Sequence, residues 1–259
     1  MKQLIELFSY RELIYNLAMK QIKVNFKQSL LGFVWAILKP ACTVLILTIV
    51  FSRIAKFPSD GIPYPLFAFG ALIPWTFFTT MIGAGVPSLV NNAHLIKKIY
   101  FPREVLPLST IIGALLDVAI SAVIFIGLLV FYRVGITVNI FYIIPIFVVA
   151  FLFGFGLVLL LGTVNVWYRD VNQATSLLLQ FWMYLTPIIY PFSMVPEKYR
   201  ALYVINPMVG IVEGFRNAVI KGTMPDIGLL GISTAIATVT FIVGYLVFKS
   251  NEFDFADVI

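Results

Sequence analysis

Two charged residues interrupt long apolar stretches and are the first candidates for chemistry. Asp117 stands in the run GALLDVAIS, and Lys39 stands just before Pro40 in WAILKP. An ionisable group within a membrane-spanning segment faces protein or water and is by default a pointer to a substrate or ion pathway. A structural hydrogen bond, to Ser121 or to backbone, is the alternative for Asp117, and extension to the membrane surface is the alternative for Lys39. A direct ion pair between Lys39 and Asp117 is a further alternative.

Aromatic side chains recur inside the apolar stretches as well as at their ends. They make up 15% of the chain, with 24 phenylalanines and 12 tyrosines. Some belong to the interfacial belts of a membrane protein, and ordinary core packing accounts for others. Sugar rings also pack their C–H faces on aromatic planes, so an aromatic lining would let a glycan slide without strong trapping hydrogen bonds. The aromatic residues inside the apolar stretches are Phe33, Trp35, Trp75, Phe77, Phe78, Phe181, Trp182, Tyr184 and Tyr190.

Several catalytic and binding motifs are absent from the sequence. There is no G-x-x-x-x-G-K-[ST] motif, so the chain does not bind ATP through a P-loop. His94 is the only histidine and Cys42 the only cysteine, which excludes a histidine-rich metal site, a cysteine cluster and an intrachain disulfide. No helix-turn-helix or basic repeat indicates nucleic acid. We therefore expect no catalytic residues, metal or cofactor on this chain.

The composition identifies the solvent around most of the chain. Hydrophobic types make up 61% of the 259 residues and charged types 12%. Soluble domains carry roughly 45–50% apolar and about 25% charged residues, and a soluble fold of this length could not bury the excess. A soluble enzyme, a disordered chain and a DNA-binding domain are thereby excluded. The net charge of +6 then indicates basic cytoplasmic edges beside anionic lipid.

The apolar stretches predict an all-α integral membrane protein with six transmembrane helices. Each span needs about 20 apolar residues to cross the hydrocarbon core. The spans are expected at residues 30–54, 65–90, 105–131, 139–165, 174–191 and 227–248. They form a transmembrane domain over residues 30–248, followed by a cytoplasmic tail at 249–259.

Residues 1–29 alternate charged and apolar types at helical spacing. This pattern predicts an amphipathic helix lying in the membrane interface. A soluble helix packed on a partner is the alternative. Charged residues interrupt every apolar run here, so the segment is not a signal peptide. The candidate contacts to lipid headgroups are Arg11, Lys20, Lys23 and Lys27.

The distribution of lysine and arginine predicts the orientation. With six spans, ten of these residues fall on the side of the N-terminus and seven on the other side, leaving Lys39 uncounted. Cytoplasmic loops carry the excess of positive charge. The expected arrangement is a multi-pass protein of the plasma (inner) membrane with both termini in the cytoplasm.

The segment 192–226 is too mixed to be a span. It contains the polar run VPEKYR, followed by apolar residues at helical spacing, with Glu213 and Arg216 three residues apart. A helix of about a dozen residues is too short to cross the membrane. We expect short re-entrant helices on the outer side, and an extracellular loop helix without a gating role is the alternative.

Five motifs in order resemble the permease subunit of type-2 ATP-binding-cassette (ABC) exporters for lipid-linked polysaccharide. The motifs are SLLGFVWAILKP, NNAHLIKKIYFPREVLPL, GTVNVWYRDVNQ, LTPIIYPFSMVP and NPMVGIVEGFRNAVI. The similarity covers essentially the whole chain and points to permeases for O-antigen and teichoic acid. Each motif alone is degenerate, so the signal lies in their number and order.

The resemblance implies partners and roles for particular segments. Two copies of the chain would form the channel, and two copies of a separate ATPase subunit would hold ATP and magnesium. The amphipathic helix would lie close to the pyrophosphate of the lipid carrier. Residues 91–104 would be the coupling segment against the ATPase, where the proline at 102 marks the boundary before the next helix.

The resemblance also assigns candidate site residues. The coupling contacts would be Asn92, His94, Leu95, Lys97, Lys98 and Arg103. The channel lining would include Trp35, Lys39, Phe181, Tyr184 and Tyr190. The outer gate would include Glu213, Phe215 and Arg216. An ordinary solvated histidine is the alternative for His94.

The expected function is that of a channel-forming permease subunit, not an enzyme, which moves lipid-linked polysaccharide of the O-antigen type out of the cytoplasm. Export of teichoic acid or capsular polysaccharide is the alternative, followed by a permease for small lipids or drugs. A membrane-embedded lipid-linked glycan transferase would need clustered acids, whereas Asp117, Asp170 and Glu213 are scattered. A secondary transporter usually shows repeated halves, and the sequence shows no internal repeat.

Overall fold

The computed structural model describes residues 9–27 and 32–259, and all regular structure in these two ranges is helical. The long helices are α2 (Arg11–Lys27), α3 (Gly32–Leu47), α4 (Tyr64–Gly85), α7 (Val105–Phe131), α8 (Ile143–Trp167), α9 (Asp170–Tyr184) and α12 (Ile227–Asn251). The short ones are α5 (Ser88–Asn91), α6 (Ala93–Ile96), α10 (Glu197–Val204), α11 (Pro207–Arg216) and α13 (Phe255–Val258). Short 3-10 or π-helices are η1 (Thr48–Ile54), η2 (Val138–Tyr142), η3 (Phe192–Met194) and η4 (Asn217–Lys221).

Five helices in the described ranges are long and apolar enough to cross a membrane. They are Ile37–Ile54, Tyr64–Gly85, Val105–Phe131, Val138–Trp167 and Ile227–Asn251. These helices correspond to five of the six spans expected from the sequence, and the span at 105–131 coincides with α7. A multi-pass helical membrane protein is therefore confirmed.

The sixth expected span, 174–191, does not meet the same criterion. Its helix, α9, has 15 residues and ends at Tyr184, which gives a length of about 22 Å against a hydrocarbon core about 30 Å thick. Pro187 and Pro191 follow, and a proline removes a backbone donor and disfavours helix at the residue before it. The chain consequently leaves the helix early, and the count of six full spans is not confirmed.

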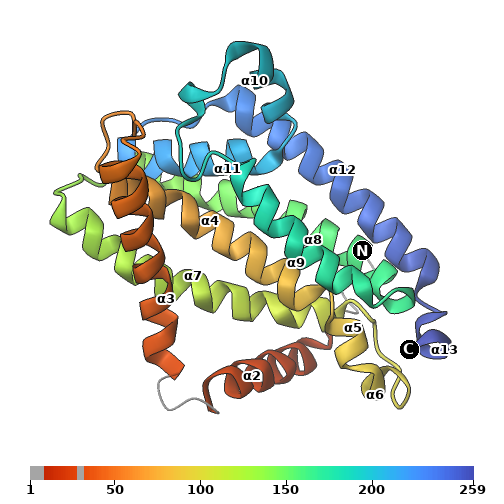
Figure 1. The fold of residues 1–259 in the computed structure, drawn as a ribbon. Coiled ribbons are helices and arrows are strands. Elements are labelled where there is room, and N and C mark those ends of the chain that lie inside the picture. The colour runs from red at the N-terminus through yellow and green to blue at the C-terminus, as the bar shows by residue number, and fades with distance from the viewer. Residues whose placement is uncertain (1–8, 28–31) are drawn as a thin grey trace.

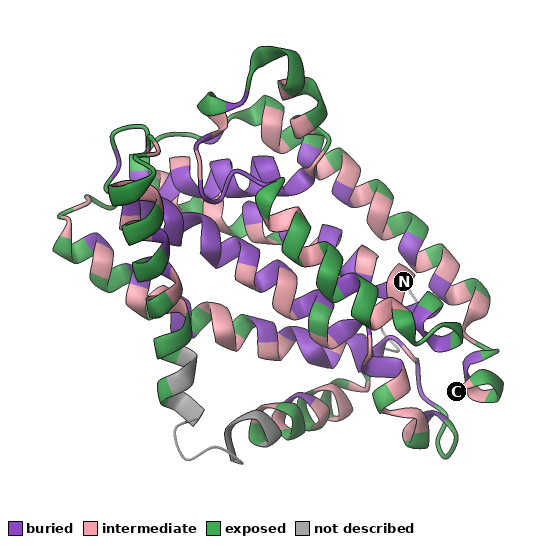
Figure 2. Ribbon diagram, in the orientation of Figure 1, coloured by how far each residue is buried: buried purple, intermediate pink, exposed green. Residues whose placement is uncertain are grey.

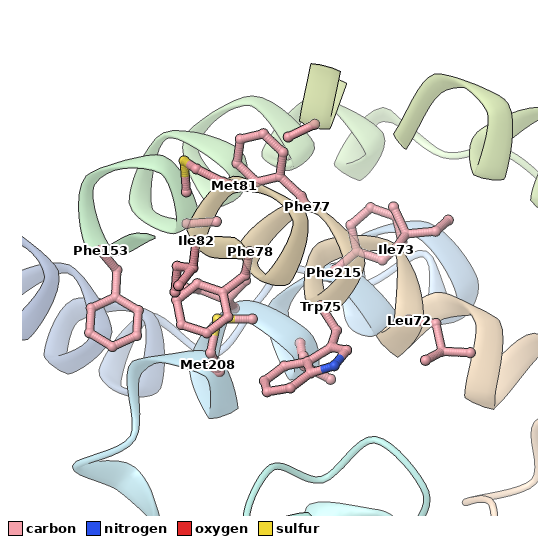
Figure 3. Close-up of a cluster of buried hydrophobic side chains, with 14 of the residues drawn as sticks. Leu72, Ile73, Trp75, Phe77, Phe78, Met81, Ile82, Phe153, Met208 and Phe215 are labelled. Atoms are coloured by element: carbon pink, nitrogen blue, oxygen red, sulfur yellow. The ribbon is translucent and has the colours of Figure 1, made fainter. Parts of the chain in front are cut away.

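Helix α4 lies at the centre of the bundle. Of its span, 78% is buried inside the protein, compared with 11% for Ile37–Ile54 and 17% for α12. Figure 2 shows this contrast as a buried α4 and α11 surrounded by more exposed helices. The phenylalanines Phe77 and Phe78 of α4 pack against α8, and Phe78 stacks on Phe153 with ring centroids 5.3 Å apart (Figure 3). The central span is thus shielded mainly by protein, not by lipid.

Helices α8 and α12 cross closely at two glycines. A Cβ on Gly244 would overlap the backbone of Gly156, and a Cβ on Gly156 would overlap the backbone near Phe241. Small residues allow helix backbones to approach in a membrane, where van der Waals packing replaces the hydrophobic effect. This contact holds α12 against α8 along the bundle.

The amphipathic helix expected near the N-terminus is present as α2. Ala18 is buried, Leu13, Ile14 and Leu17 pack on the core, and Lys20 and Lys23 are exposed. Helix α2 packs against α7 and α3, so its apolar face is covered at least in part by protein. Of the expected headgroup and channel residues, the side chains of Lys27 and Trp35 lie outside the described part of the structure.

The connections gather at two ends of the bundle. Figure 1 shows α5, α6 and α13 together at one end, with the loop before α4 and helix α10 at the other. Residues 249–259, expected as a tail, complete α12 and fold back as α13. Phe255 is buried and contacts the rings of Phe248 and Trp167.

Candidate functional site

The first half of the segment 91–104 is a polar corner between helices. Asn92 separates α5 from α6, and its side chain donates a hydrogen bond of 2.8 Å to the carbonyl of Ser88. Ile96 is buried and Leu95 packs against the core, which anchors the corner from below. The remaining expected contacts, His94, Lys97 and Lys98, are exposed. The corner therefore exposes the ammonium groups of Lys97 and Lys98, while Leu95 and Ile96 pack against the core of the protein.

The second half of this segment is held by the end of α12. Phe101 is buried, and the guanidinium of Arg103 lies 5.1 Å above its ring. The backbone N–H of Arg103 donates to Glu252 Oε1 at 3.2 Å. Partial burial lowers the pKa of Arg103 from its ordinary value while Glu252 acts in the opposite direction, and an arginine remains protonated at neutral pH in either case.

Glu104, at the end of this segment, forms a charged cluster with Lys249 and Glu252 that was not predicted from the sequence. Glu104, which is only 2% exposed, lies 2.6 Å from Lys249 Nζ, and Lys249 lies 2.6 Å from Glu252. The other carboxylate oxygen of Glu104 is buried without a partner in the described ranges. The available signal was an acid just before a long apolar run and a Lys–Glu pair three residues apart at the end of another.

The cluster and α13 fasten the segment 91–104 to the C-terminal end of the chain. Lys97 Nζ donates to the main-chain carbonyl of Ile259 at 3.0 Å, and α13 packs against α6 and α8. Since Glu104 immediately precedes α7, a displacement of the segment would act on α7 and α12 together.

Helix α9 carries an exposed face that mixes aromatic and polar side chains. Phe181 and Tyr184 are 59% and 62% exposed, and Gln173, Ser176 and Gln180 are exposed as well. Figure 2 shows this exposed face along α9. Helix α7 differs, because its strongly exposed side chains are the aliphatic Leu115, Val123, Ile126 and Val130 and, at its last position, Phe131, and it exposes no amide or hydroxyl side chain. A wholly apolar face suits lipid, whereas a face with amides and hydroxyls suits water or a polar substrate.

Tyr190 does not extend this exposed face. Its hydroxyl donates to the carbonyl of Tyr184 at 2.8 Å and lies 2.9 Å from the hydroxyl of Tyr203 on α10. Nearby, Trp182 Nε1 donates to Asn206 Oδ1 at 3.0 Å, and the same oxygen caps α11 at Met208. Tyr190 therefore joins the end of α9 to α10.

The expected gate residues lie inside the protein. Arg216 is 1% exposed and lies 2.8 Å from Glu213, its neighbour one turn away. Phe215 is buried against the rings of Phe125 and Phe147. The structure thus brings the acid and the base of the sequence prediction together, in the contact between α11 and the core.

Arg216 holds three segments together. Its guanidinium donates to the carbonyls of Pro187 at 2.6 Å and Ile188 at 2.8 Å, both in the loop after α9. It also donates to the carbonyl of Phe67 on α4 at 3.1 Å and lies 3.6 Å from the Phe67 ring centroid. We call Arg216, Glu213 and these three carbonyls the arginine lock.

Asp117 accepts a hydrogen bond from Thr80 of α4 at 3.3 Å. Lys39 is exposed on α3, and the ion pairs found in the described ranges do not include Lys39 or Asp117. Asp117 is thus joined to a neighbouring helix by a hydrogen bond from Thr80, and not from Ser121. Within the described ranges, no group of three His, Cys, Asp or Glu side chains could hold a metal ion.

The amino-acid sequence is similar to those of known transport proteins. The chain is 29% identical over 255 residues to the O-antigen export system permease protein RfbA of Myxococcus xanthus, covering 97% of both chains. It is 29% identical over 251 residues to a protein of the same name from Klebsiella pneumoniae, covering 96% of this chain and 95% of the relative. It is 27% identical over 242 residues to the polysialic acid transport protein KpsM of Escherichia coli, covering 91% and 92%. The ABC-2 type transporter family matches residues 12–220, and the chain belongs to this family of membrane transport components.

Proposed function

We propose that this chain is the channel-forming permease subunit of an ATP-driven exporter that moves lipid-linked polysaccharide of the O-antigen type from the cytoplasmic side of the inner membrane. The observation that carries the proposal is the similarity to O-antigen export permeases over 96–97% of the chain. The family match and the five membrane-crossing helices support the same role.

Two copies of the chain form the channel in this proposal, and two copies of a separate ABC ATPase supply the energy. The exposed face of α9 supports it, because polar and aromatic side chains there have no cover within one copy. Phe181 and Tyr184 offer planes on which sugar rings can slide. ATP and magnesium bind to the ATPase subunits.

The segment 91–104 receives the movement of the ATPase. Its exposed cations, Lys97 and Lys98, suit contact with another protein, while its buried base joins it to α7 and α12. ATP binding closes the ATPase dimer, and the rigid displacement of this segment shifts both helices. The glycan then advances past α9, and the segments held by the arginine lock open at the outer end.

Export of a capsular polysaccharide is the second candidate. It is favoured by the similarity to KpsM, whose identity of 27% over 242 residues is slightly below that of the O-antigen permeases. Both candidates share the same fold, the same partners and a glycan polymer as cargo.

The proposal is tested by the ATPase activity of the complete transporter in lipid nanodiscs. We expect a lipid-linked polysaccharide to change the rate of ATP hydrolysis, and the bare polyprenyl phosphate lipid to leave it near the basal rate. A rate that does not respond to any lipid-linked polysaccharide, in a transporter that hydrolyses ATP, contradicts the proposal.

A further inference from the structure

A polar pocket lies between α2 and the helices α4, α5 and α7. Its volume is about 420 Å³, and most of its lining side chains are polar although the chain is 61% hydrophobic. The lining residues are Leu17, Lys20, Gln21, Thr80, Gly83, Ala84, Pro87, Ser88, Asn91, Asn92, Ser109 and Thr110. No carboxylate is among them. We call this cavity the α2 pocket.

The mouth of the α2 pocket carries free hydrogen-bond donors. Lys20, Gln21 and Asn91 are exposed, and their side chains make no hydrogen bond in the described ranges. Together they offer one positive charge and two amide groups. This combination suits a phosphate group, which takes a charge-assisted hydrogen bond from lysine and further bonds from neutral donors.

The deeper wall offers acceptors instead. Ser88, Ser109 and Thr110 are buried, and each donates its hydroxyl hydrogen to a carbonyl three residues earlier. Thr80 donates to Asp117. Because each hydroxyl hydrogen is already used, the oxygen lone pairs remain to accept hydrogen bonds. The wall therefore suits a ligand group that donates, such as a hydroxyl or an ammonium.

The pocket is not a packing necessity. A Cβ on Gly83 would meet nothing within 4 Å, so the glycine is not required by a neighbouring helix. Its lack of a side chain leaves the pocket open. Glycine costs roughly 1 kcal/mol relative to alanine in a helix interior, and a larger side chain at this position would take up space in the pocket.

We propose that the α2 pocket binds the phosphate headgroup of a lipid, with the phosphate at Lys20 and a hydroxyl or ammonium of the headgroup at the hydroxyl wall. The sequence pattern of α2 predicts a helix at the membrane interface, where such headgroups lie. Two lipids share this chemistry, namely a membrane phospholipid with a glycerol or ethanolamine headgroup and the sugar-bearing diphosphate lipid that carries the glycan. The site is independent of which polymer the exporter moves.

Native mass spectrometry of the delipidated full-length protein tests the site. Phosphatidylglycerol, phosphatidylethanolamine and a polyprenyl diphosphate sugar are titrated separately. Lys20→Met removes the charge and should weaken binding of the preferred lipid about tenfold, the effect of one lost charge-assisted hydrogen bond. Gly83→Leu fills the pocket and should weaken binding of the same lipid by excluding its headgroup. The matched controls are Gly113→Leu, where a Cβ also meets nothing within 4 Å, and Lys198→Met, an exposed lysine outside the pocket.

The preferred probe identifies the source of the headgroup. Tightest binding of a phospholipid, lost in the pocket variants and kept in the controls, assigns the site to the membrane. The same dependence with the diphosphate sugar assigns it to the transported lipid. Equal binding of every probe by the pocket variants and the controls overturns the proposal, and the unfolding temperature of each variant shows whether Gly83→Leu has kept the fold.

Discussion

At the scale of single residues, the buried guanidinium of Arg216 shows how a charge persists inside an apolar protein. Its hydrogen bonds to Glu213 and to three backbone carbonyls replace the water that it loses. A buried ion pair offers little net stability compared with apolar residues, but removing one partner leaves the other charge uncompensated. The arginine lock therefore fixes the positions of α4, α11 and the loop after α9 relative to one another.

Replacement of Arg216 by methionine should destabilise the protein by about 3–5 kcal/mol, because Glu213 and three carbonyls lose their partner. Thermal unfolding of the purified protein in detergent measures the change. Arg200→Met is the control, since Arg200 pairs with Glu197 at 3.6 Å on the surface and such pairs contribute up to about 1 kcal/mol. Similar losses in the two variants would show that the arginine lock does not stabilise the fold.

Residue types were easier to predict than their partners. Glu213 and Arg216 are three residues apart, a spacing at which side chains of one helix can meet, and in the structure they lie 2.8 Å apart. The contacts of Arg216 with Phe67 span 149 residues of sequence. Those contacts depend on the tertiary packing of α11 against α4, for which the local pattern carries no signal.

At the scale of elements, the segment 91–104 has an exposed part with Lys97 and Lys98 and a buried part with Phe101 and Glu104. Lys98→Glu should reduce the ratio of substrate-stimulated to basal ATPase activity, because it reverses a charge at the proposed contact with the ATPase. Lys97→Glu should add to the effect while also losing the bond to Ile259. The ATPase assay in nanodiscs measures both.

Lys198→Glu is the control for this charge reversal. Lys198 belongs to α10, at the opposite end of the bundle (Figure 1). Its reversal should leave the ratio of stimulated to basal activity unchanged. Equal ratios in Lys98→Glu and Lys198→Glu would rule out the segment 91–104 as the contact.

The cluster of Glu104, Lys249 and Glu252 should transmit movement from this segment to α12. Lys249→Met leaves Glu104 buried without its cation, so we expect stimulated ATPase activity to fall more than basal activity. Glu104→Gln combined with Lys249→Met should recover part of the loss, because the buried charge is then removed as well. Equal loss in the single and double variants would argue against a coupled pair.

Element boundaries followed the sequence closely where proline and polar residues mark them. Helix α7 begins and ends where expected. The fifth expected span, 174–191, runs past the end of α9 at Tyr184, because apolar composition alone does not mark the break that precedes Pro187. The cluster at Glu104 joins residues nearly 150 positions apart, and only the folded bundle brings them together.

At the scale of the whole molecule, one copy of the chain presents two kinds of exposed surface. The apolar side of α7 suits lipid, and the mixed face of α9 suits water, glycan or a second copy. Composition alone predicted lipid as the general solvent, but it could not distinguish these faces, because both contain apolar residues at helical spacing.

Cysteine labelling distinguishes the two faces. In a Cys42→Ser background, Tyr184→Cys should react with a membrane-impermeant maleimide in the assembled transporter, because a channel face contacts water. Val123→Cys, 71% exposed on α7, should react slowly because lipid surrounds it. Equal labelling of the two positions would contradict a channel face on α9.

The central claim is that this chain forms the export path for a lipid-linked glycan. Deletion of its gene, followed by quantification of surface glycan and of lipid-linked glycan inside the cell, tests the claim most directly. The account predicts that surface glycan is lost, that the lipid-linked polymer accumulates inside, and that the intact gene restores export. Unchanged surface glycan, or its loss without internal accumulation of the polymer, would contradict the account.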